Sequence, residues 1–384
     1  MVSKLNILFV SSWFPSTEKP TLGNFVETHA KAIARHHLVN VLYATKRHQK
    51  PLFSYEERQD NNLKIGIMYY RASRIGISLL DKLIDAIRHL QSYNRLFRQL
   101  EKTPDLVHAN IVWPIGLWAL WLKFRYGLKF ILTEHWSVYQ PENRHKISCL
   151  QKILFKRIIN KASVLTPVSS QLGEAIRGIG IDKPYRVVPN AIDTQLFRFK
   201  PKEKTATFSF LHISTLVDEV KNVSGILRAF QQLLQVDSDN SLTIVSDGDI
   251  TPFVNYVETL SIPKDKITFI GTQTAEQIAE HFYRANVFVL FSNYENLPVV
   301  ILEAFATGTP VISTNVGGIS EHFPDGFGEL IPKQDEQALL TSMIKLKANY
   351  STSSFNTLSE YAEKMFSFNS VAQAYSNIYK DILT

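Results

Sequence analysis

The 384-residue sequence contains a single cysteine, Cys149, and no long hydrophobic run. One cysteine excludes an internal disulfide framework and a cysteine-rich zinc site, which fits a reducing compartment. The longest apolar stretch, near residues 111–122, is too short to span a bilayer. The apolar run after Lys4 is likewise too short for the core of a secretory signal. We therefore expect a soluble, cytoplasmic protein.

Several nucleotide-binding and metal-binding signatures are also absent. No G-x-G-x-x-G follows a predicted strand, because the nearest pair, Gly178 and Gly180, follows a helix and lacks the third glycine. No Walker lysine motif exists, so nicotinamide chemistry and P-loop hydrolysis are both disfavoured. Asp237 and Asp239 could form a metal-binding D-x-D, but they precede a strand, and a capping turn is the favoured interpretation. We expect no metal and no cofactor.

The charge is divided unevenly along the chain. Residues 1–188 contain 28 lysines and arginines and 13 acidic residues, a net +15, whereas residues 189–384 contain 14 and 22, a net −8. Such asymmetry indicates that one half faces an anionic surface or substrate, although drift in surface composition could produce part of it.

Apolar strands alternate with helices along the whole chain, which predicts an α/β protein with doubly wound parallel sheets. The length is enough for roughly two to three domains. Strands are predicted at residues 6–10, 39–44, 63–70, 105–109, 129–133, 164–168 and 186–188, and again at 208–213, 241–245, 266–270, 287–291 and 310–313. The segment between the second and third strands is too polar to assign. Residues 195–205 are charged and aperiodic, and they indicate a linker between two units.

Two helices of the first half are distinctive. Residues 79–100 form a predicted amphipathic helix, with apolar residues recurring at three and four and with Lys82, Arg88, Arg95 and Arg98 between them. A second helix contains Trp113, Trp118 and Trp121. A membrane belt is one interpretation of these tryptophans, but their place between two buried strands favours a core helix.

Residues 286–318 form the stretch on which the functional prediction rests. An apolar strand at 287–291 leads into a polar loop, and Pro298 is predicted at the first position of a helix that ends at Gly308. The free N–H groups at such a helix start favour a phosphate. Glu295 and Glu303, spaced E-x7-E, could accept hydrogen bonds from sugar hydroxyls on either side of a diphosphate. The alternative is that Glu295 is a solvated loop residue and Glu303 an exposed helix residue, with no ligand bound by either.

Three further residues are candidates for the same site. Lys221, predicted at the start of a helix, could balance the charge of a diphosphate leaving group, or it could be a solvated lysine. Gly23 allows the backbone to approach a ligand closely, or it serves an ordinary turn. His135 lies at the end of a strand, where ligand sites of open α/β sheets gather, although a lone histidine there is more often structural.

These motifs resemble the family 4 retaining glycosyltransferases of the GT-B fold. Segments 189–193, 221–222, 247–248, 295–312 and 317–321 are similar to that family's signature in the second half, and the first half matches more loosely through Gly23, 105–108 and 133–135. The resemblance implies two Rossmann-like doubly wound domains facing across a cleft. It places an acceptor-binding domain at 1–188, a nucleotide-sugar-binding domain at 189–365, and a helix at 366–384 that crosses back to the first domain.

The resemblance also implies the role of each candidate. Glu303 would hold the donor ribose, and Glu295 would hold the transferred sugar. The diphosphate would be bound by Lys221 and by main-chain N–H groups near Gly23, Asn296, Leu297 and Val299. His135 would lie beside the reacting sugar. The leaving phosphate would help to deprotonate the acceptor on the same face. Two positions depart from the family pattern. Thr215 replaces a common phosphate-binding arginine, which leaves Lys221 to balance a larger share of the phosphate charge. Pro298 replaces a glycine and removes one N–H.

We therefore expect a retaining, metal-independent glycosyltransferase that takes a nucleotide-diphosphate sugar and a lipid-linked or glycan acceptor in cell-surface polysaccharide biosynthesis. The basic first half, with Arg71 and Arg74 beside the amphipathic helix, is expected to contact an anionic inner leaflet peripherally. No nucleic-acid partner is expected. A nucleotide-sugar epimerase of the same fold is one alternative. A non-catalytic regulatory protein that binds sugar nucleotides is the other.

Overall fold

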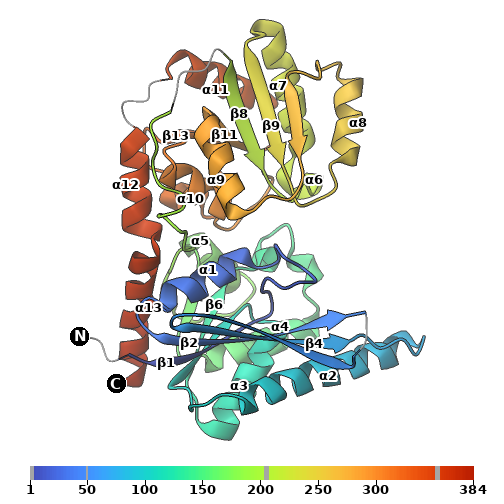
Figure 1. The fold of residues 1–384 in the computed structure, drawn as a ribbon, viewed down its shortest axis with the longest axis vertical. Helices are drawn as coiled ribbons and strands as arrows, with labels where there is room; N and C mark the ends of the chain where they lie inside the picture. The colour runs from blue at the N-terminus through green and yellow to red at the C-terminus, as the bar shows by residue number, and fades with distance from the viewer. Residues whose placement is uncertain (1–3, 49–50, 203–206, 351–354) are drawn as a thin grey trace. The chain divides into compact units, whose positions relative to one another are not determined.

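A computed structural model of the chain describes residues 4–48, 51–202, 207–350 and 355–384. The chain forms two compact units, the first made of Met1–Ala191 with Phe368–Thr384 and the second of Ile192–Ser367. Each unit contains one sheet, parallel except for one edge strand of the first, with helices packed around it (Figure 1). The predicted α/β class with two doubly wound units is thus confirmed.

The first sheet has seven strands in the order β3-β4-β2-β1-β5-β6-β7. Its strands are β1 (Asn6–Ser11), β2 (Leu38–Arg47), β3 (Phe53–Asp60), β4 (Leu63–Arg71), β5 (Leu106–Asn110), β6 (Phe130–Glu134) and β7 (Leu165–Pro167). All neighbours are parallel except β3, which pairs antiparallel with β4. This edge strand falls in the segment that the sequence left unassigned. Its polar side chains suit an edge, where water solvates one side of the strand.

The segment 186–188, predicted as a strand, lies along β7 without forming a regular strand of its own: the N–H groups of Arg186 and Val188 donate to the carbonyls of Leu165 and Pro167 over 3.0 and 3.2 Å, and the neighbouring Tyr185 makes an isolated bridge to Leu165. The helices of the first unit are α1 (Asn24–Ile33), α2 (Ser78–Arg98), α3 (Ile115–Tyr126), α4 (Cys149–Lys161), α5 (Ser170–Arg177) and α13 (Phe368–Leu383), with short 3-10 turns at Ser137–Tyr139 and Arg144–Lys146. The prediction of a core helix holds for Trp118, which is 3% exposed, and fails for Trp121, which is 40% exposed. Trp113 precedes α3.

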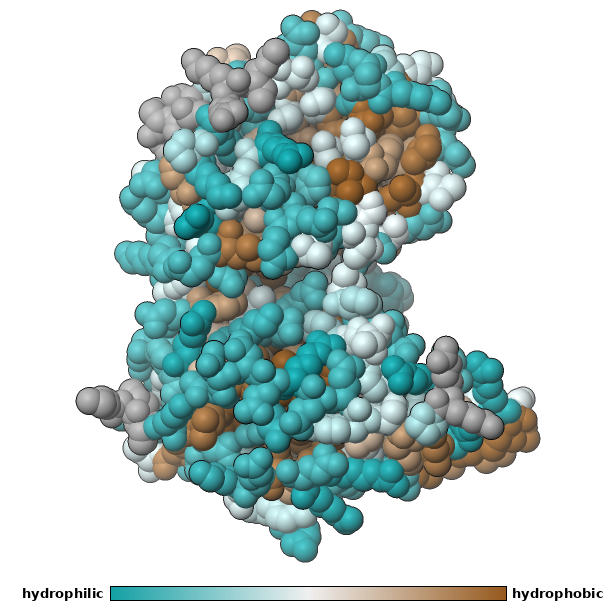
Figure 2. Space-filling view, viewed as in Figure 1, coloured by the Kyte–Doolittle hydropathy of each residue, from teal (hydrophilic) through white to brown (hydrophobic). Residues whose placement is uncertain are grey.

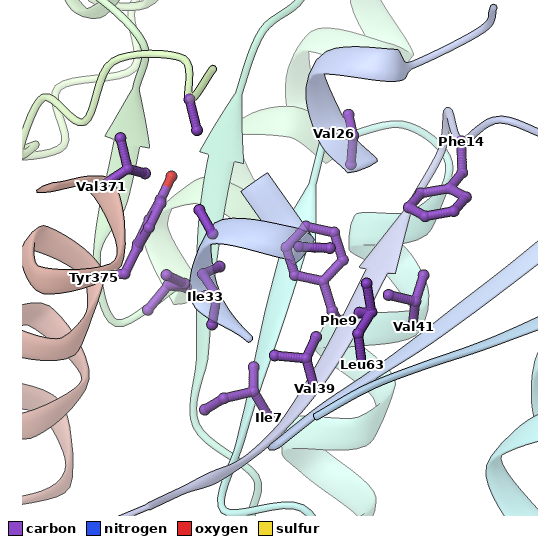
Figure 3. Close-up of a cluster of buried hydrophobic side chains, with 14 of the residues drawn as sticks. Ile7, Phe9, Phe14, Val26, Ile33, Val39, Val41, Leu63, Val371 and Tyr375 are labelled. Atoms are coloured by element: carbon purple, nitrogen blue, oxygen red, sulfur yellow. The ribbon is translucent and has the colours of Figure 1, made fainter. Parts of the chain in front are cut away.

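The last helix, α13, completes the core of the first unit. Figure 3 shows Val371 and Tyr375 of α13 beside Ile33 of α1, in the same cluster as Phe9 of β1. Buried polar contacts add to this packing, since His108 Nδ1 lies 2.7 Å from the Tyr379 hydroxyl. The C-terminal segment is therefore an integral part of the first unit.

The second sheet has six parallel strands in the order β10-β9-β8-β11-β12-β13. These strands are β8 (Phe208–Ile213), β9 (Asn240–Val245), β10 (Ile267–Ile270), β11 (Val287–Leu290), β12 (Val311–Thr314) and β13 (Gly328–Ile331). The central strand β11 is wholly buried, as its continuous apolar run predicts for a parallel strand covered on both faces.

The helices of the second unit include one that the sequence did not separate from its neighbour, α6. They are α6 (Asp218–Lys221), α7 (Val223–Val236), α8 (Thr251–Thr259), α9 (Ala275–Arg284), α10 (Val299–Ala306), α11 (Glu336–Ala348) and α12 (Phe355–Phe366), with a 3-10 turn at Ile319–His322. The prediction of a linker at 195–205 is wrong for its described part, 195–202, and residues 203–205 lie outside the described residues. The buried Lys202 ammonium donates to the carbonyls of Phe282 and Ala285 and to the Thr309 hydroxyl, which fixes the segment to the second unit.

Candidate functional site

The loop at residues 292–297 follows β11 and is anchored on both sides at the carboxyl end of the second sheet. The Asn293 N–H donates to the carbonyl of Val220 over 2.7 Å, and the Asn293 side-chain amide donates to the carbonyl of Glu219 over 3.0 Å. On the other side the Thr314 hydroxyl donates to the carbonyl of Ser292 over 2.7 Å. The loop is therefore held between α6 and the end of β12.

Gly317 permits a close approach of two backbone segments at this loop. Its φ is +60°, and a Cβ built there would lie 2.1 Å from the carbonyl oxygen of Glu295. The next N–H, of Gly318, donates to the carbonyl of Asn296 over 2.7 Å. Any side chain at position 317 would push the loop outward, so glycine is required both by conformation and by space.

Lys221 and Glu295, two of the predicted catalytic residues, form an ion pair across 74 residues of sequence. The Lys221 Nζ lies 2.5 Å from Glu295 Oε1, and the Ser292 hydroxyl donates to the same oxygen over 2.8 Å. The two charged side chains are only 16% and 11% exposed. A cation and a hydrogen-bonded carboxylate are thus concentrated in one sheltered position at the end of the sheet.

A break between two helices places Lys221. The sequence predicts it at the start of a helix, whereas it is the last residue of the short helix α6. Asn222 then adopts a left-handed conformation with φ +48°, and α7 begins at Val223. The Asp218 carboxylate joins the two helices, because it accepts both the N–H and the hydroxyl of Ser224, over 2.9 and 2.7 Å. The lysine therefore projects from a rigid junction rather than from a regular helix.

The helix after the loop begins one residue later than the sequence predicts. Pro298 has φ −71° and ψ 122°, so it is the residue before the helix, and Val299 is the first helical residue of α10. The first N–H groups of a helix have no carbonyl one turn earlier and have a partial positive charge. The side chains of Asn296 and Leu297 are buried, at 8% and 4% exposure, so the part they can offer a ligand is chiefly main chain.

Glu303 lies in the second turn of α10 in an environment unlike that of Glu295. Its side chain is partly exposed, and among the described residues none donates a hydrogen bond to its carboxylate. Burial raises the pKa of Glu303 to about 8, because the charged form loses solvation without gaining a partner. The carboxyl group is therefore largely protonated at neutral pH in the ligand-free chain.

In the first unit, Gly23 is the residue before α1 and has φ +77°. A Cβ at this position would lie 2.7 Å from the carbonyl carbon of Trp13 and 2.9 Å from the nitrogen of Phe14. The loop after β1 is consequently packed directly against the start of α1. Glycine is required here both for an ordinary turn and for the predicted contact with a ligand. The close packing against Trp13 and Phe14 explains the glycine without any ligand.

His135 follows β6 and lies against α1. Its ring is 4.8 Å from the ring of Phe25 and 5.1 Å from that of His29, between ring centres. It is 8% exposed, and burial, followed by the neighbouring imidazoles of His29 and His108, holds the pKa of His135 well below its usual range. The side chain is therefore neutral at physiological pH.

Glu134, which the sequence did not single out, fixes the turn that contains His135. One carboxylate oxygen accepts the N–H groups of His135 and Trp136, each over 3.1 Å, and the other accepts the Val112 N–H over 3.0 Å and the Tyr139 hydroxyl over 3.1 Å. Burial raises the pKa of Glu134 to about 7 despite these donors. Its position as the one charged residue at the end of a predicted buried strand was the available signal.

The structure thus groups the predicted residues within their units. Lys221, Glu295 and the loop–helix segment with Glu303 lie together in the second unit, whereas Gly23 and His135 lie near α1 in the first.

The described residues contain no group of three histidine, cysteine or acidic side chains close enough to hold a metal ion. Asp237, considered above as a metal ligand, accepts the Asp239 N–H over 2.9 Å and pairs with Lys347 over 2.5 Å, as a turn residue would. Within the part of the chain that the structure describes, no helix is long and apolar enough to cross a membrane.

Comparison with known proteins identifies the family. The model of Glycosyltransferase Family 4 matches residues 22–196, and the model of Glycosyl transferases group 1 matches residues 193–365. The putative teichuronic acid biosynthesis glycosyltransferase TuaC of Bacillus subtilis is 26% identical over 359 residues, covering 89% of each chain. The N-acetyl-alpha-D-glucosaminyl L-malate synthase of Bacillus anthracis is 29% identical over 243 residues, covering 59% of this chain and 61% of that protein.

Solved structures show the same fold. Sucrose-phosphate synthase from Thermosynechococcus elongatus superposes with a TM-score of 0.78 at 20% identity, covering 99% of both chains. Anabaena HepE, solved in complex with UDP and glucose, superposes with a TM-score of 0.71 at 16% identity, covering 98% of this chain and 99% of that one. Because the two family models together extend over residues 22–365 and the fold agrees over nearly the whole length, the chain belongs to the family 4 glycosyltransferases of the GT-B fold.

Proposed function

We propose that the chain transfers a sugar from a nucleotide-diphosphate sugar to a hydroxyl group, with retention of the anomeric configuration and without a metal. The observation that carries this proposal is the Lys221–Glu295 pair beside the start of α10. A cation and free helix N–H groups suit a diphosphate, and carboxylates suit sugar hydroxyls.

Each residue has a role in this proposal. The Glu303 carboxyl would receive the ribose hydroxyls, which would provide the hydrogen-bond donors that the described chain does not. Glu295 would hold the transferred sugar, while Lys221 and the N–H groups around Leu297 and Val299 would bind the diphosphate. Since Lys221 contacts Glu295 in the ligand-free chain, donor binding would exchange one anionic partner of the lysine for another.

In the reaction, the bond between the anomeric carbon and the phosphate oxygen breaks, and its electron pair leaves with the diphosphate. Lys221 and the helix N–H groups would stabilise the charge that develops on the leaving group. The acceptor hydroxyl would attack the same face and pass its proton to the departing phosphate oxygen. This mechanism needs no separate general base. His135 is buried and neutral, and in this proposal it lies beside the sugar and transfers no proton.

The first unit would bind the acceptor. It contains 29 basic and 14 acidic residues, a net +15, against −8 for the second unit. A positive unit suits an anionic acceptor such as a lipid-diphosphate-linked sugar or a growing acidic glycan. The similarity to TuaC supports a place in cell-surface polysaccharide biosynthesis. The enzyme would then work in the cytoplasm, in peripheral contact with the inner leaflet.

A screen of nucleotide sugars by thermal shift tests this proposal, because a true donor raises the melting temperature by linkage. The donor identified in this way is then incubated with and without candidate acceptors, and the products are separated. Donor hydrolysis that becomes transfer when acceptor is added supports the proposal, and EDTA should leave the rate unchanged. An epimerised nucleotide sugar formed without acceptor would establish the epimerase instead, and binding without any turnover would establish a regulatory protein.

A further inference from the structure

Helix α2 and the segment just before it expose a row of aliphatic side chains to solvent. These residues, which we call the apolar strip, are between 41% and 79% exposed: Ile75, Ile77, Leu79, Leu80, Leu83, Ile87 and Leu90. Figure 2 shows brown surface over the part of the first unit where Figure 1 places α2. Contiguous exposed apolar surface of this kind marks an interaction site on most soluble proteins.

The apolar strip contributes little to the core, because α2 packs through a different face. The buried residues of the helix are Asp85, Ser92, Tyr93 and Leu96. The Tyr93 hydroxyl donates to the carbonyl of Ser11 over 2.9 Å, and Asp85 pairs with Lys46 over 2.8 Å. The fold therefore does not account for the seven exposed aliphatic residues, five on the remaining surface of the helix and two, Ile75 and Ile77, just before it.

Exposed aromatic residues of α3 extend the same surface. Phe97, near the end of α2, packs against Tyr126 with ring centres 5.3 Å apart, and Tyr126 packs against Trp121 at 5.6 Å. Trp121, Phe124 and Tyr126 are 40%, 70% and 49% exposed. Tryptophan and tyrosine have an apolar ring and a polar edge, and they are enriched where a protein meets the boundary between lipid and water.

The charges around the apolar strip are almost entirely positive. Residues 71–98 contain six basic residues: Arg71, Arg74, Lys82, Arg88, Arg95 and Arg98. The two carboxylates of the segment are engaged locally, since Asp81 accepts the N–H groups of Ile75 and Gly76, and Asp85 is buried against Lys46. An exposed apolar row beside uncompensated cations is the pattern of a helix that lies in a membrane interface.

We propose that α2 and the aromatic residues of α3 insert into the headgroup boundary of an anionic bilayer, with the apolar strip in contact with acyl chains. Phosphate groups of the lipids would pair with the flanking arginines. A second copy of the chain is a poorer occupant, because joining two strips would bring twelve basic residues together. The proposal deepens the membrane contact proposed above by naming the surface that inserts, and it does not depend on the donor site. Failure of this proposal or of the sugar-transfer proposal leaves the other intact.

Co-sedimentation of the full chain with vesicles tests the proposal. Vesicles of phosphatidylcholine alone are compared with vesicles that also contain phosphatidylglycerol, at low and raised salt. The triple variant Leu79→Gln, Leu83→Gln, Ile87→Gln removes apolar surface without changing charge, and glutamine is a good helix former. A matched control replaces Val254, a 38% exposed residue of α8 in the second unit, by Gln. Circular dichroism checks that each variant is folded.

We expect the parent to bind the anionic vesicles, to retain part of that binding at raised salt, and to bind the neutral vesicles weakly. The triple variant should lose at least about tenfold in affinity for anionic vesicles, since binding scales with buried apolar area. The Val254→Gln variant should bind as the parent does. Replacing Arg88, Arg95 and Arg98 by Gln should remove the salt-sensitive part.

Three results would overturn the proposal. If the triple variant binds anionic vesicles as tightly as the parent, the contact is electrostatic and the apolar strip does not insert. If analytical ultracentrifugation finds that the parent is a dimer and that the triple variant is a monomer, the strip is an interface between copies. Absence of binding to anionic vesicles at low salt would also overturn the proposal.

Discussion

The two units share a parallel sheet covered by helices, but they place their titratable groups in different environments. In the second unit, Lys221 and Glu295 form a sheltered ion pair at the carboxyl end of the sheet. In the first unit, five histidines have a pKa below the usual range because they are buried: His29, His37, His89, His108 and His135. The basic residues of that unit are instead concentrated on its surface.

This difference teaches how one architecture can provide two different environments for titratable groups. Paired charges cost desolvation free energy, which is justified where a ligand with its own charge replaces one member of the pair. Neutral imidazoles can be buried at lower cost, and they fasten α13 to the sheet through contacts such as that between His108 and Tyr379. Under the proposed function, the second unit would carry the chemistry and the first would provide a stable surface for the acceptor.

The largest expected effect is that of removing the cation from the second unit. Lys221→Ala should lower kcat by roughly 100- to 1000-fold, the scale observed when one preorganised stabiliser of a leaving group is lost. Lys264→Ala is the matched control, because the Lys264 side chain in the same unit is 91% exposed and its removal should leave kcat unchanged. Steady-state kinetics with the identified donor measure both variants. A loss of less than about threefold for Lys221→Ala would assign the phosphate role to another residue.

The next effect separates the two glutamates. Glu295→Ala should depress kcat, since it would remove both the sugar contact and the partner of Lys221, whereas Glu303→Ala should mainly raise KM for the donor. We expect about 10- to 100-fold in each case, as for the loss of a charge-assisted hydrogen bond. Donor titration by calorimetry together with kinetics distinguishes the two. Variants that bind and turn over as the parent does would contradict the proposed site.

The buried histidines predict that acid weakens the first unit before the second. The pKa is about 3 for His29 and about 4 for His37 in the folded chain, against an ordinary value of 6.5. The unfolded state then binds more protons, so the free energy of unfolding falls as the pH drops from about 6.5 towards 4. Glu134, with its raised pKa, opposes this trend as a single carboxyl. We expect a loss of about 2 kcal/mol or more by pH 4.5.

Hydrogen exchange at pH 7 and pH 4.5 measures this loss unit by unit. Protection should decrease in α1 and α13 more than in β11 and α7, because among the described residues of the second unit only His212 has a pKa as low as about 4. Equal loss of protection in both units would show that the histidine network does not govern acid stability.

The smallest effect has the opposite sign and lies in the second unit. The pKa of Glu303 is raised to about 8, so the stability that its neutral form contributes is complete below pH 4.5 and is lost as the pH rises through 8. Glu303→Gln, which keeps the shape and cannot ionise, should therefore stabilise the ligand-free chain at pH 8.5 by about 1–2 kcal/mol. Denaturant unfolding at pH 8.5 and pH 4.5 tests this. The gain should disappear at the lower pH, and a gain that is independent of pH would refute the ionisation argument.

Much of the site could be predicted from local sequence. The apolar run of β11, the polar loop after it and the helix that contains Glu303 follow one another within 20 residues, and such local patterns determine secondary structure directly. The N-terminal boundary of α10 was wrong by one residue, because proline suits the position before a helix as well as the first one. Strand β3 was missed because an edge strand has little apolar signal.

By itself, the sequence determined the alternation of strands and helices, the E-x7-E spacing and the opposite charges of the two halves. Only the tertiary structure decided which distant groups meet: Lys221 with Glu295, His108 with Tyr379, and the apolar row of α2 with solvent. The physical reason is that periodicity reports which residues share a face of one element. The order of strands in the sheets and the packing direction of each helix decide what lies opposite that face, and these depend on contacts among residues far apart in the chain.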